Sequence, residues 1–596
     1  MIRLESQHVI AFPRESVWPV LSRTDWINRS VGLPAVSYEM ARNAEGGSTV
    51  RARGRMLGAE WRWLELPFEW QEPEFYRAHR IFDSGPFKEG YFGMNMLAEA
   101  GDRTRVIFYA EVEPRNAFTR WLSEHIIGPK TARDMARIVA QTEAFLRGQA
   151  AVAIPKLPVH PVNEAGFTTG LKKLHASGQP PDLVERLAAL LRESPDVALT
   201  HVRPLAIARQ WERDSWEVLG LFLHATRAGL LDLSWEVLCP NCRSSSQPAT
   251  SLGRLRRGAH CDVCQIEFDA EFDRSVELKF AVNPAIRPPE TQTFCLTGPG
   301  GKPHVLSQFV LAAGEERAWK LPPRRGPLRL RSPQVRRSLT VDADEALRTL
   351  VCEAGQFVVE HGPADEPGAV RVRNPNAFPV LLALEQIGWS DDILTAARVT
   401  NWQDFRDLFS SEVISPAEQV TVGSQVVLFT DLRGSTAMYH GLGDAPAYAL
   451  VRDHFSVLAD ATRTHRGTVV KTIGDAVMAT FSRVDEALAA ARRMHAEIPA
   501  MRTADGVPLT LKSSLHVGPC LAVNANDRLD FFGTTINLAA RMVECSRGGD
   551  LVVSDELFQR PEMRAFLEAA PASPEPLEVR FRGFDAPHRV WRITMA

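Results

Sequence analysis

The chain has 596 residues, of which 45% are hydrophobic and 24% charged, and its formal net charge is −3. This length exceeds what one hydrophobic core organises, and the composition is typical of soluble globular proteins, so several domains are expected. The small net charge argues against a whole-chain polyanion binder and leaves room for local basic patches.

No membrane or export signal is visible. No apolar stretch reaches the ~18 residues that span a bilayer, and residues 1–6 lack the apolar core of a signal peptide. We therefore expect a cytoplasmic protein with no membrane span.

Residues 1–148 alternate apolar and polar side chains and end in a helical pattern over 118–146. A strand, a short helix at 16–21, a run of strands and a long closing helix, with the opening segment FPRESVW at 12–18, resemble the START-like (SRPBCC) helix-grip fold. The resemblance implies a sheet around an apolar cavity, where aromatic residues either line a small-ligand site or fill the core. These aromatic residues are Trp61, Trp63, Trp70, Phe82 and Phe92.

A proline-bearing linker at 154–161 leads to a helical segment at 165–235, where leucines recur at helical spacing. Residues 273–390 form short alternating runs separated by Pro and Gly, which predict an all-β, sandwich-like module. Residues 391–418 predict a connecting helix, because Phe405, Leu408, Phe409 and Val413 form one apolar stripe. This helix is either a packed spacer or an element that passes a signal to the last domain.

Two C-x-x-C pairs stand eighteen residues apart within 236–272, and their members are Cys239, Cys242, Cys261 and Cys264. Four thiolates at this spacing are typical of a tetrahedral structural Zn²⁺ with no open position for a substrate. We therefore predict a zinc ribbon. Arginines near this ribbon would permit nucleic-acid contact, but no aromatic residues are interleaved for base stacking, so nucleic acid is not an expected partner.

Two carboxylates stand at predicted strand ends in the last third of the chain. An apolar strand at 426–430 leads to Asp431, and a Gly-Ser-Thr turn follows that could offer backbone N–H groups to phosphate. Residues 467–481 predict two strands joined by a tight turn at Gly474 and Asp475. Paired carboxylates at neighbouring strand ends favour a site for two Mg²⁺ or Mn²⁺ ions.

Residues 528–542 predict a strand, a glycine break and a helix. Asn537 and Arg541 are four residues apart and so share one face of this helix. A neutral hydrogen-bonding group beside a guanidinium suits orienting a sugar and stabilising charge on a phosphate.

Together these three segments closely resemble the class III adenylate and guanylate cyclase catalytic domain, here over 420–596, with a ferredoxin-like α/β fold. The chain as a whole is thus expected to be a multidomain α+β protein. The resemblance implies that Asp431 and Asp475 bind two metal ions. It also implies that Lys471 and Asp530 recognise adenine, at positions where guanylate cyclases tend to carry Glu and Cys.

The resemblance further implies that Asn537 orients the ribose, that Arg541 stabilises the α-phosphate, and that a homodimer forms two shared sites. Arg582 stands where a triphosphate-binding Lys is common, and Ser435 and Thr534 replace a common Phe and Asp. Residues 165–415 resemble an uncharacterised region found upstream of bacterial cyclase domains, which implies no activity.

The predicted function is therefore an adenylate cyclase that converts ATP to 3′,5′-cyclic AMP and pyrophosphate, regulated by its N-terminal modules. Lys471 can donate to adenine N1 and Asp530 can accept from the exocyclic amine, whereas guanine reverses this pattern. Two alternatives stay open. One is a guanylate cyclase, and the other is a ligand- or nucleic-acid-binding regulator with a non-catalytic cyclase fold.

Overall fold

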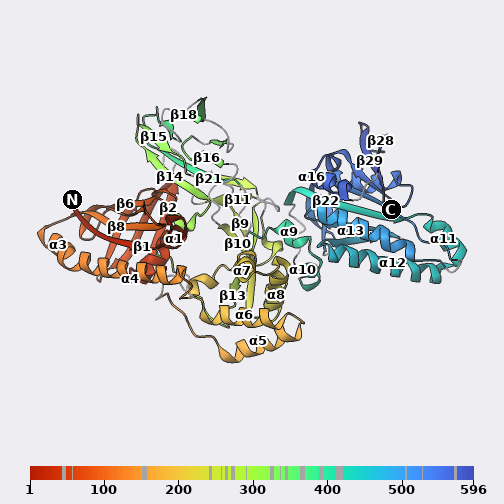
Figure 1. The fold of residues 1–596 in the computed structure, drawn as a ribbon, viewed down its shortest axis with the longest axis horizontal. Coiled ribbons are helices and arrows are strands. Elements are labelled where there is room, and N and C mark those ends of the chain that lie inside the picture. Colours follow the sequence, from red (N-terminus) through yellow and green to blue (C-terminus); the bar gives the residue numbers. More distant parts are fainter. Residues whose placement is uncertain are drawn as a thin grey trace.

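The computed structural model forms an elongated molecule with the N-terminal elements at one end and the C-terminal domain at the other (Figure 1). No helix in the described part of the chain combines the length and apolar character needed to cross a membrane. The structure describes all residues except 43–47, 57, 151–156, 240–244, 257, 262–265, 270–274, 290–291, 323–327, 336, 342–346, 363–368, 388–392, 410–411, 413–419, 504–505, 526–527, 570–572 and 596.

The N-terminal module is a curved antiparallel sheet with one long helix packed against its first strand. Its elements are β1 (Ile2–Ile10), α1 (Arg14–Leu21), α2 (Thr24–Ser30), β2 (Val36–Arg42), β3 (Ser48–Met56), β4 (Ala59–Glu65), β5 (Glu69–Gln71), β6 (Phe75–Phe82), β7 (Phe87–Glu99), β8 (Arg103–Pro114), α3 (Ala117–Leu122) and α4 (Gly128–Leu146). Helix α4 contacts β1 and buries Met135, Ile138 and Val139 on one face. The long closing helix was predicted from its periodicity.

Several of the aromatic residues expected in this module pack on one another. Trp61, Trp63 and Phe82 are buried and meet at ring-centroid distances of 6.1–6.4 Å. Trp70 is 1% exposed and donates its indole N–H to the carbonyl of Val305 at 2.9 Å. These contacts favour the core-filling alternative, and a small apolar ligand stays a prediction.

A β module follows further along the chain and is continuous with the N-terminal sheet. Its strands are β14 (Val305–Leu311), β15 (Glu316–Lys320), β16 (Leu328–Ser332), β17 (Arg337–Val341), β18 (Leu347–Glu353), β19 (Gln356–His361), β20 (Ala369–Arg373) and β21 (Val380–Gln386). Strand β14 pairs with β5, so one sheet runs through both modules. A second sheet, β15-β20-β18-β19, shares an apolar core with it.

The middle module joins helices to a small antiparallel sheet. Its elements are α5 (Glu164–Ala176), α6 (Pro181–Glu193), α7 (Pro204–Trp211), α8 (Ser215–Arg227), β9 (Leu231–Leu238), β10 (Ser245–Ala249) and β13 (Val276–Val282). Strand β13 pairs with β9, so it belongs to this sheet and not to the β module that 273–390 predicted. Local alternation identifies a strand but not its partner, and here the partner lies upstream.

The predicted ribbon is only partly described. Cys239 directly follows β9 and Cys261 ends β11 (Gly258–Cys261), which forms a hairpin with β12 (Ile266–Asp269). Both cysteines are buried. Cys242 and Cys264 lie outside the described residues, so zinc binding stays a prediction.

The described residues of the connecting segment form two short helices, α9 (Ala396–Thr400) and α10 (Gln403–Leu408), in place of the longer helix that was predicted. Helix α10 ends at Leu408, and the next residue, Phe409, has the non-helical angles φ −126° and ψ 49°. Glu412 then accepts hydrogen bonds from the Trp235 indole and the Leu252 amide, both at 2.9 Å. This contact fixes the chain to the middle module, and Val413 lies outside the described residues.

In its described residues, the C-terminal domain is an eight-stranded sheet with helices on both faces. Its elements are β22 (Val420–Leu432), α11 (Ser435–Leu442), α12 (Asp444–Thr464), β23 (Thr468–Ile473), β24 (Ala476–Phe481), α13 (Val484–Glu497), β25 (Leu511–Ala525), β26 (Arg528–Phe532), α14 (Thr534–Met542), β27 (Asp550–Ser554), α15 (Asp555–Phe558), α16 (Pro561–Ala569), β28 (Glu575–Val579) and β29 (His588–Thr594).

Successive side chains of β22 point alternately into two different hydrophobic cores. Val426 and Leu428 face the core that α12 and α13 cover. Val427 and Phe429 face a second core, which also contains residues of α14 and Phe405 of α10. The connecting segment therefore packs on the same face of the sheet as α14.

Candidate active site

The two predicted metal-binding aspartates lie at the same end of adjacent strands. Asp431 is the penultimate residue of β22, and Asp475 lies in the turn between β23 and β24, where Gly474 adopts φ +64°. The amide of Leu432 donates to Asp475 Oδ2 at 3.3 Å. Burial and the neighbouring charge of Asp475 raise the pKa of Asp431. Two crowded carboxylates suit divalent cations, because a bound cation would relieve their repulsion.

The two predicted base-recognising residues form an ion pair. Lys471 lies on β23 and Asp530 on β26, and Lys471 Nζ is 2.6 Å from Asp530 Oδ2. Asp530 Oδ1 accepts from the amide of Phe531 at 2.8 Å. The side chains are 39% and 17% exposed, so this donor–acceptor pair is reachable from solvent.

The remaining predicted residues lie on exposed surface of the same domain. Asn537 and Arg541 are exposed on α14, and Arg541 Nη1 contacts Glu544 Oε1 at 3.3 Å. Arg582 is exposed in the connection between β28 and β29. The preceding residue, Phe581, is buried in one apolar cluster with residues of α14, which keeps this connection close to that helix.

Two residues of α10 contact the strands of the base-recognising pair. Gln403 Oε1 accepts from Thr468 Oγ1 at 2.9 Å and from the amide of Val469 at 3.1 Å, both on β23. Arg406 Nη2 donates to the carbonyl of Leu529 on β26. Sequence reasoning missed both residues, because a contact between residues far apart in the chain leaves no local pattern of residue types.

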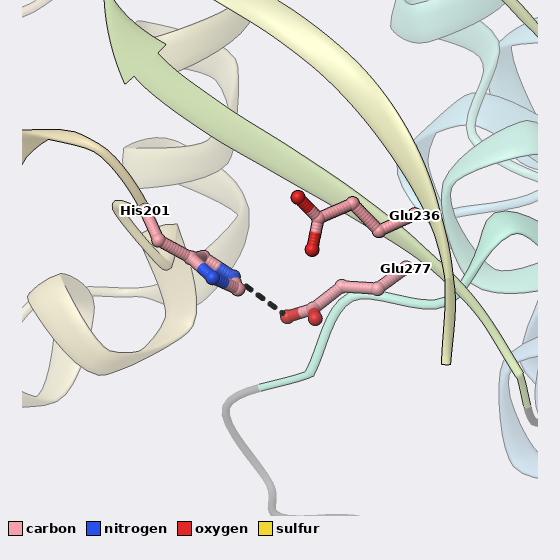
Figure 2. Close-up of side chains that lie close together, drawn as sticks. All are labelled: His201, Glu236 and Glu277. Carbon is pink, nitrogen blue, oxygen red and sulfur yellow. Dashed lines mark ion pairs between the residues drawn. The ribbon is translucent and has the colours of Figure 1, made fainter. Parts of the chain in front are cut away.

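A separate group of possible metal ligands lies in the middle module (Figure 2). His201 Nε2 is 3.5 Å from Glu277 Oε1, and Glu236 lies beside them. Arg203 also contacts Glu277 at 2.9 Å, and Lys279 contacts Glu236 at 2.6 Å. Burial tends to raise the pKa of Glu277, but the neighbouring His201 and Arg203 hold it below its ordinary value. Since two cations already balance the carboxylates, the group is a buried ion-pair network.

Comparisons with known proteins identify two regions of the chain. Residues 416–570 match the model of the adenylate and guanylate cyclase catalytic domain. Residues 167–293 match a family of unknown function (DUF5939). The C-terminal part of this multidomain α+β chain is therefore a class III nucleotidyl cyclase catalytic domain, as its motifs predicted.

Similar proteins match over the same C-terminal part. The uncharacterized protein Rv2212 of Mycobacterium tuberculosis is 31% identical over 183 residues, which are 30% of this chain and 43% of that protein. Adenylate cyclase 2 of Rhizobium meliloti is 25% identical over 179 residues, which are 28% of this chain and 49% of that protein. The chain spans less than half the length of these curated relatives.

Solved structures of cyclase domains are also similar. The adenylyl cyclase CyaB from P. aeruginosa is 21% identical with a TM-score of 0.26, covering 30% of this chain and 97% of the solved one. A rhodopsin-guanylyl cyclase core with converted specificity, in complex with ATPαS, is 22% identical with a TM-score of 0.27, covering 30% of this chain and 98% of the solved one.

Proposed function

We propose that the C-terminal domain is an adenylate cyclase that converts ATP to 3′,5′-cyclic AMP and pyrophosphate. The observation that carries this proposal is the contact of Lys471 with Asp530 at 2.6 Å, which holds a donor beside an acceptor. Adenine offers an acceptor at N1 beside a donor at its exocyclic amine, so this pair complements adenine and opposes guanine. The contact also satisfies the charge of each side chain.

The other site residues have matching tasks in the reaction. The 3′-hydroxyl oxygen attacks the α-phosphorus, the bond to pyrophosphate breaks, and the hydroxyl proton passes to solvent. Asn537 orients the ribose and Arg541 neutralises charge that builds on the α-phosphate. Arg582 and the backbone amides after Asp431 bind the triphosphate. Asp431 and Asp475 would hold Mg²⁺ or Mn²⁺, and such ions would lower the pKa of the hydroxyl and offset the charge of the phosphates.

We further propose that two chains form a homodimer with two shared sites. Asp431 and Asp475 would come from one subunit, and its partner would supply Lys471, Asp530, Asn537 and Arg541. Asn537 and Arg541 are exposed on α14, which leaves them accessible to a second subunit. A symmetric pair then contains two equivalent composite sites.

The direct test is to incubate the purified full chain with Mn²⁺ and either ATP or GTP and to separate the products by nucleotide chromatography. We expect cyclic AMP from ATP and little cyclic GMP from GTP. Cyclic GMP alone would instead identify a guanylate cyclase. No cyclic nucleotide from either substrate would identify a non-catalytic regulator.

Exchange of the base-recognising pair should weaken the preference for ATP. The double substitution Lys471→Glu with Asp530→Cys removes the donor to N1 and the acceptor for the amine. Each lost or reversed buried hydrogen bond costs about 1–3 kcal/mol, so the ratio of kcat/KM for ATP over GTP should fall at least tenfold. An unchanged ratio would contradict base recognition by these two residues.

We also propose that one structural Zn²⁺ binds Cys239, Cys242, Cys261 and Cys264. Elemental analysis should find about one zinc per chain, and chelation or Cys261→Ser should unfold the middle module, because metal binding and folding are coupled. Cys352→Ser is a matched control, since Cys352 is buried in the β module. Absence of zinc, or iron in its place, would contradict the proposal.

A further inference from the structure

Helix α10 of the connecting segment bridges the two strands that carry the base-recognising pair. Gln403 accepts two hydrogen bonds from Thr468 and Val469, at the start of the strand that carries Lys471. Arg406 donates to the carbonyl of Leu529, the residue before Asp530. One helical turn separates Gln403 from Arg406, so a single rigid element contacts both strands.

The environment of Arg406 is unusual for a residue that serves packing alone. Burial lowers the pKa of Arg406 to about 10, and the charge of Asp530 opposes this shift. Arg406 Nη1 is buried and has no hydrogen-bond partner among the residues that the structure describes. A buried donor without a partner destabilises a fold. An aliphatic side chain would therefore suit packing better, so a guanidinium at this position points to a task for its charge and its donors.

Helix α10 and the residue before it also contact the middle module. Trp402, which precedes α10, contacts Trp216 of α8 with ring centroids 5.1 Å apart. Phe405 packs edge-on against Trp235 of β9 at 6.0 Å. A change in the packing of the middle module would therefore move α10, and α10 would move the strands of Lys471 and Asp530.

We propose that Arg406 is a positioning residue for base selection, which acts with Gln403 to hold Lys471 and Asp530 at the separation that recognises adenine. This inference rests on the proposed adenylate cyclase function. It extends that function, because the upstream part of the chain could then influence, through α10, which nucleotide the site selects. Arg406 acts through Leu529 and Asp530 and does not itself contact the nucleotide.

The test compares the full chain with its Arg406→Ala variant, using the ratio of kcat/KM for ATP over GTP. Loss of one charge-assisted hydrogen bond should lower this ratio about five- to tenfold. A merely structural role would lower both activities together and leave the ratio unchanged. Arg406→Lys retains a charge and one donor and should restore part of the preference.

Arg463→Ala is the matched control. Arg463 contacts Asp407 at 3.0 Å and Asp404 at 3.7 Å, so it also binds α10, but from α12. Its loss removes an arginine and its exposed ion pairs with α10 and leaves the contacts of Gln403 and Arg406 with the strands in place. The ATP over GTP ratio of this variant should stay within twofold of the unsubstituted chain.

Gln403 supplies a second test if Arg406→Ala does not fold, as judged by circular dichroism. Gln403→Ala should lower the ratio, whereas Gln403→Glu keeps an acceptor oxygen for Thr468 and Val469 and should preserve it. The inference would be overturned if each of Arg406→Ala and Gln403→Ala that folds keeps its ATP over GTP ratio within twofold of the unsubstituted chain.

Binding measurements separate this inference from the proposed function. If the unsubstituted chain makes no cyclic nucleotide, the proposed function fails. The inference is then decided by the ratio of dissociation constants for non-hydrolysable ATP and GTP analogues, measured by titration calorimetry. A preference for the ATP analogue that falls in Arg406→Ala would support it, and no preference in the unsubstituted chain would overturn it.

Discussion

Asp431→Ala and Asp475→Ala should each lower cyclic AMP formation by on the order of 10³-fold or more, because each removes a carboxylate that would bind the catalytic metal ions. The structure brings the two residues to adjacent strand ends, and the charge of Asp475 adds to burial in raising the pKa of Asp431. Asp431→Ala relieves this repulsion, whereas Asp475→Ala also removes the acceptor of the Leu432 amide, and either substitution should lower the affinity for Mn²⁺.

Two measurements together identify the cause of the loss. Initial rates of cyclic AMP formation give the activity, and titration followed by Mn²⁺ paramagnetic resonance gives the number of bound ions. Asp453→Ala is a matched control, because Asp453 is an exposed carboxylate of α12 that contacts Arg452. Near-normal activity in Asp431→Ala or Asp475→Ala would show that the metal ions bind elsewhere.

The active-site elements were predictable because each has a local signal. An apolar run followed by Asp431 marks a strand end, a glycine beside Asp475 marks a turn, and the four-residue spacing of Asn537 and Arg541 marks one helix face. The structure contains these elements as β22, the β23–β24 turn and α14. The cyclase-type domain was confirmed, whereas adenine specificity stays a proposal.

The arrangement of the modules could not be predicted in the same way. Strand β5 pairs with β14, more than two hundred residues later, through backbone hydrogen bonds that any residue type can make. Arg406 likewise binds a carbonyl 123 residues away. Such contacts depend on tertiary packing, so the hydrophobic periodicity of the sequence does not predict them.

The predicted length of the connecting helix was wrong for a related reason. Phe405, Leu408 and Phe409 do occupy one apolar stripe, but α10 ends at Leu408. Glu412 then lies against the middle module, where it accepts a hydrogen bond from the Trp235 indole. Tertiary contacts thus end a helix that periodicity alone would continue.

The shared-site model makes the second large prediction, which is recovery of activity on mixing two inactive variants. Lys471 and Asp475 are four residues apart, yet one contacts Asp530 and the other the backbone beside Asp431. In this shared-site model one chain contributes the metal-binding half of an active site, and its partner contributes the half that contains Lys471, Asn537 and Arg541. Two variants that are damaged in different halves can therefore build one intact site together. Asp431→Ala and Arg541→Ala damage different halves.

Mixed dimers of these variants contain one site with both defects and one site with none. Random pairing of equal amounts makes half of the dimers mixed, so activity should recover to about a quarter of the unsubstituted value per chain. Cyclic AMP formation is measured after the two variants are incubated together, with subunit exchange followed by fluorescence energy transfer between labelled chains. Asp431→Ala mixed with Asp475→Ala is the control, because both damage the metal-binding half and no mixed dimer contains an intact site. Exchange without recovery in the first mixture would show that each chain builds its own site.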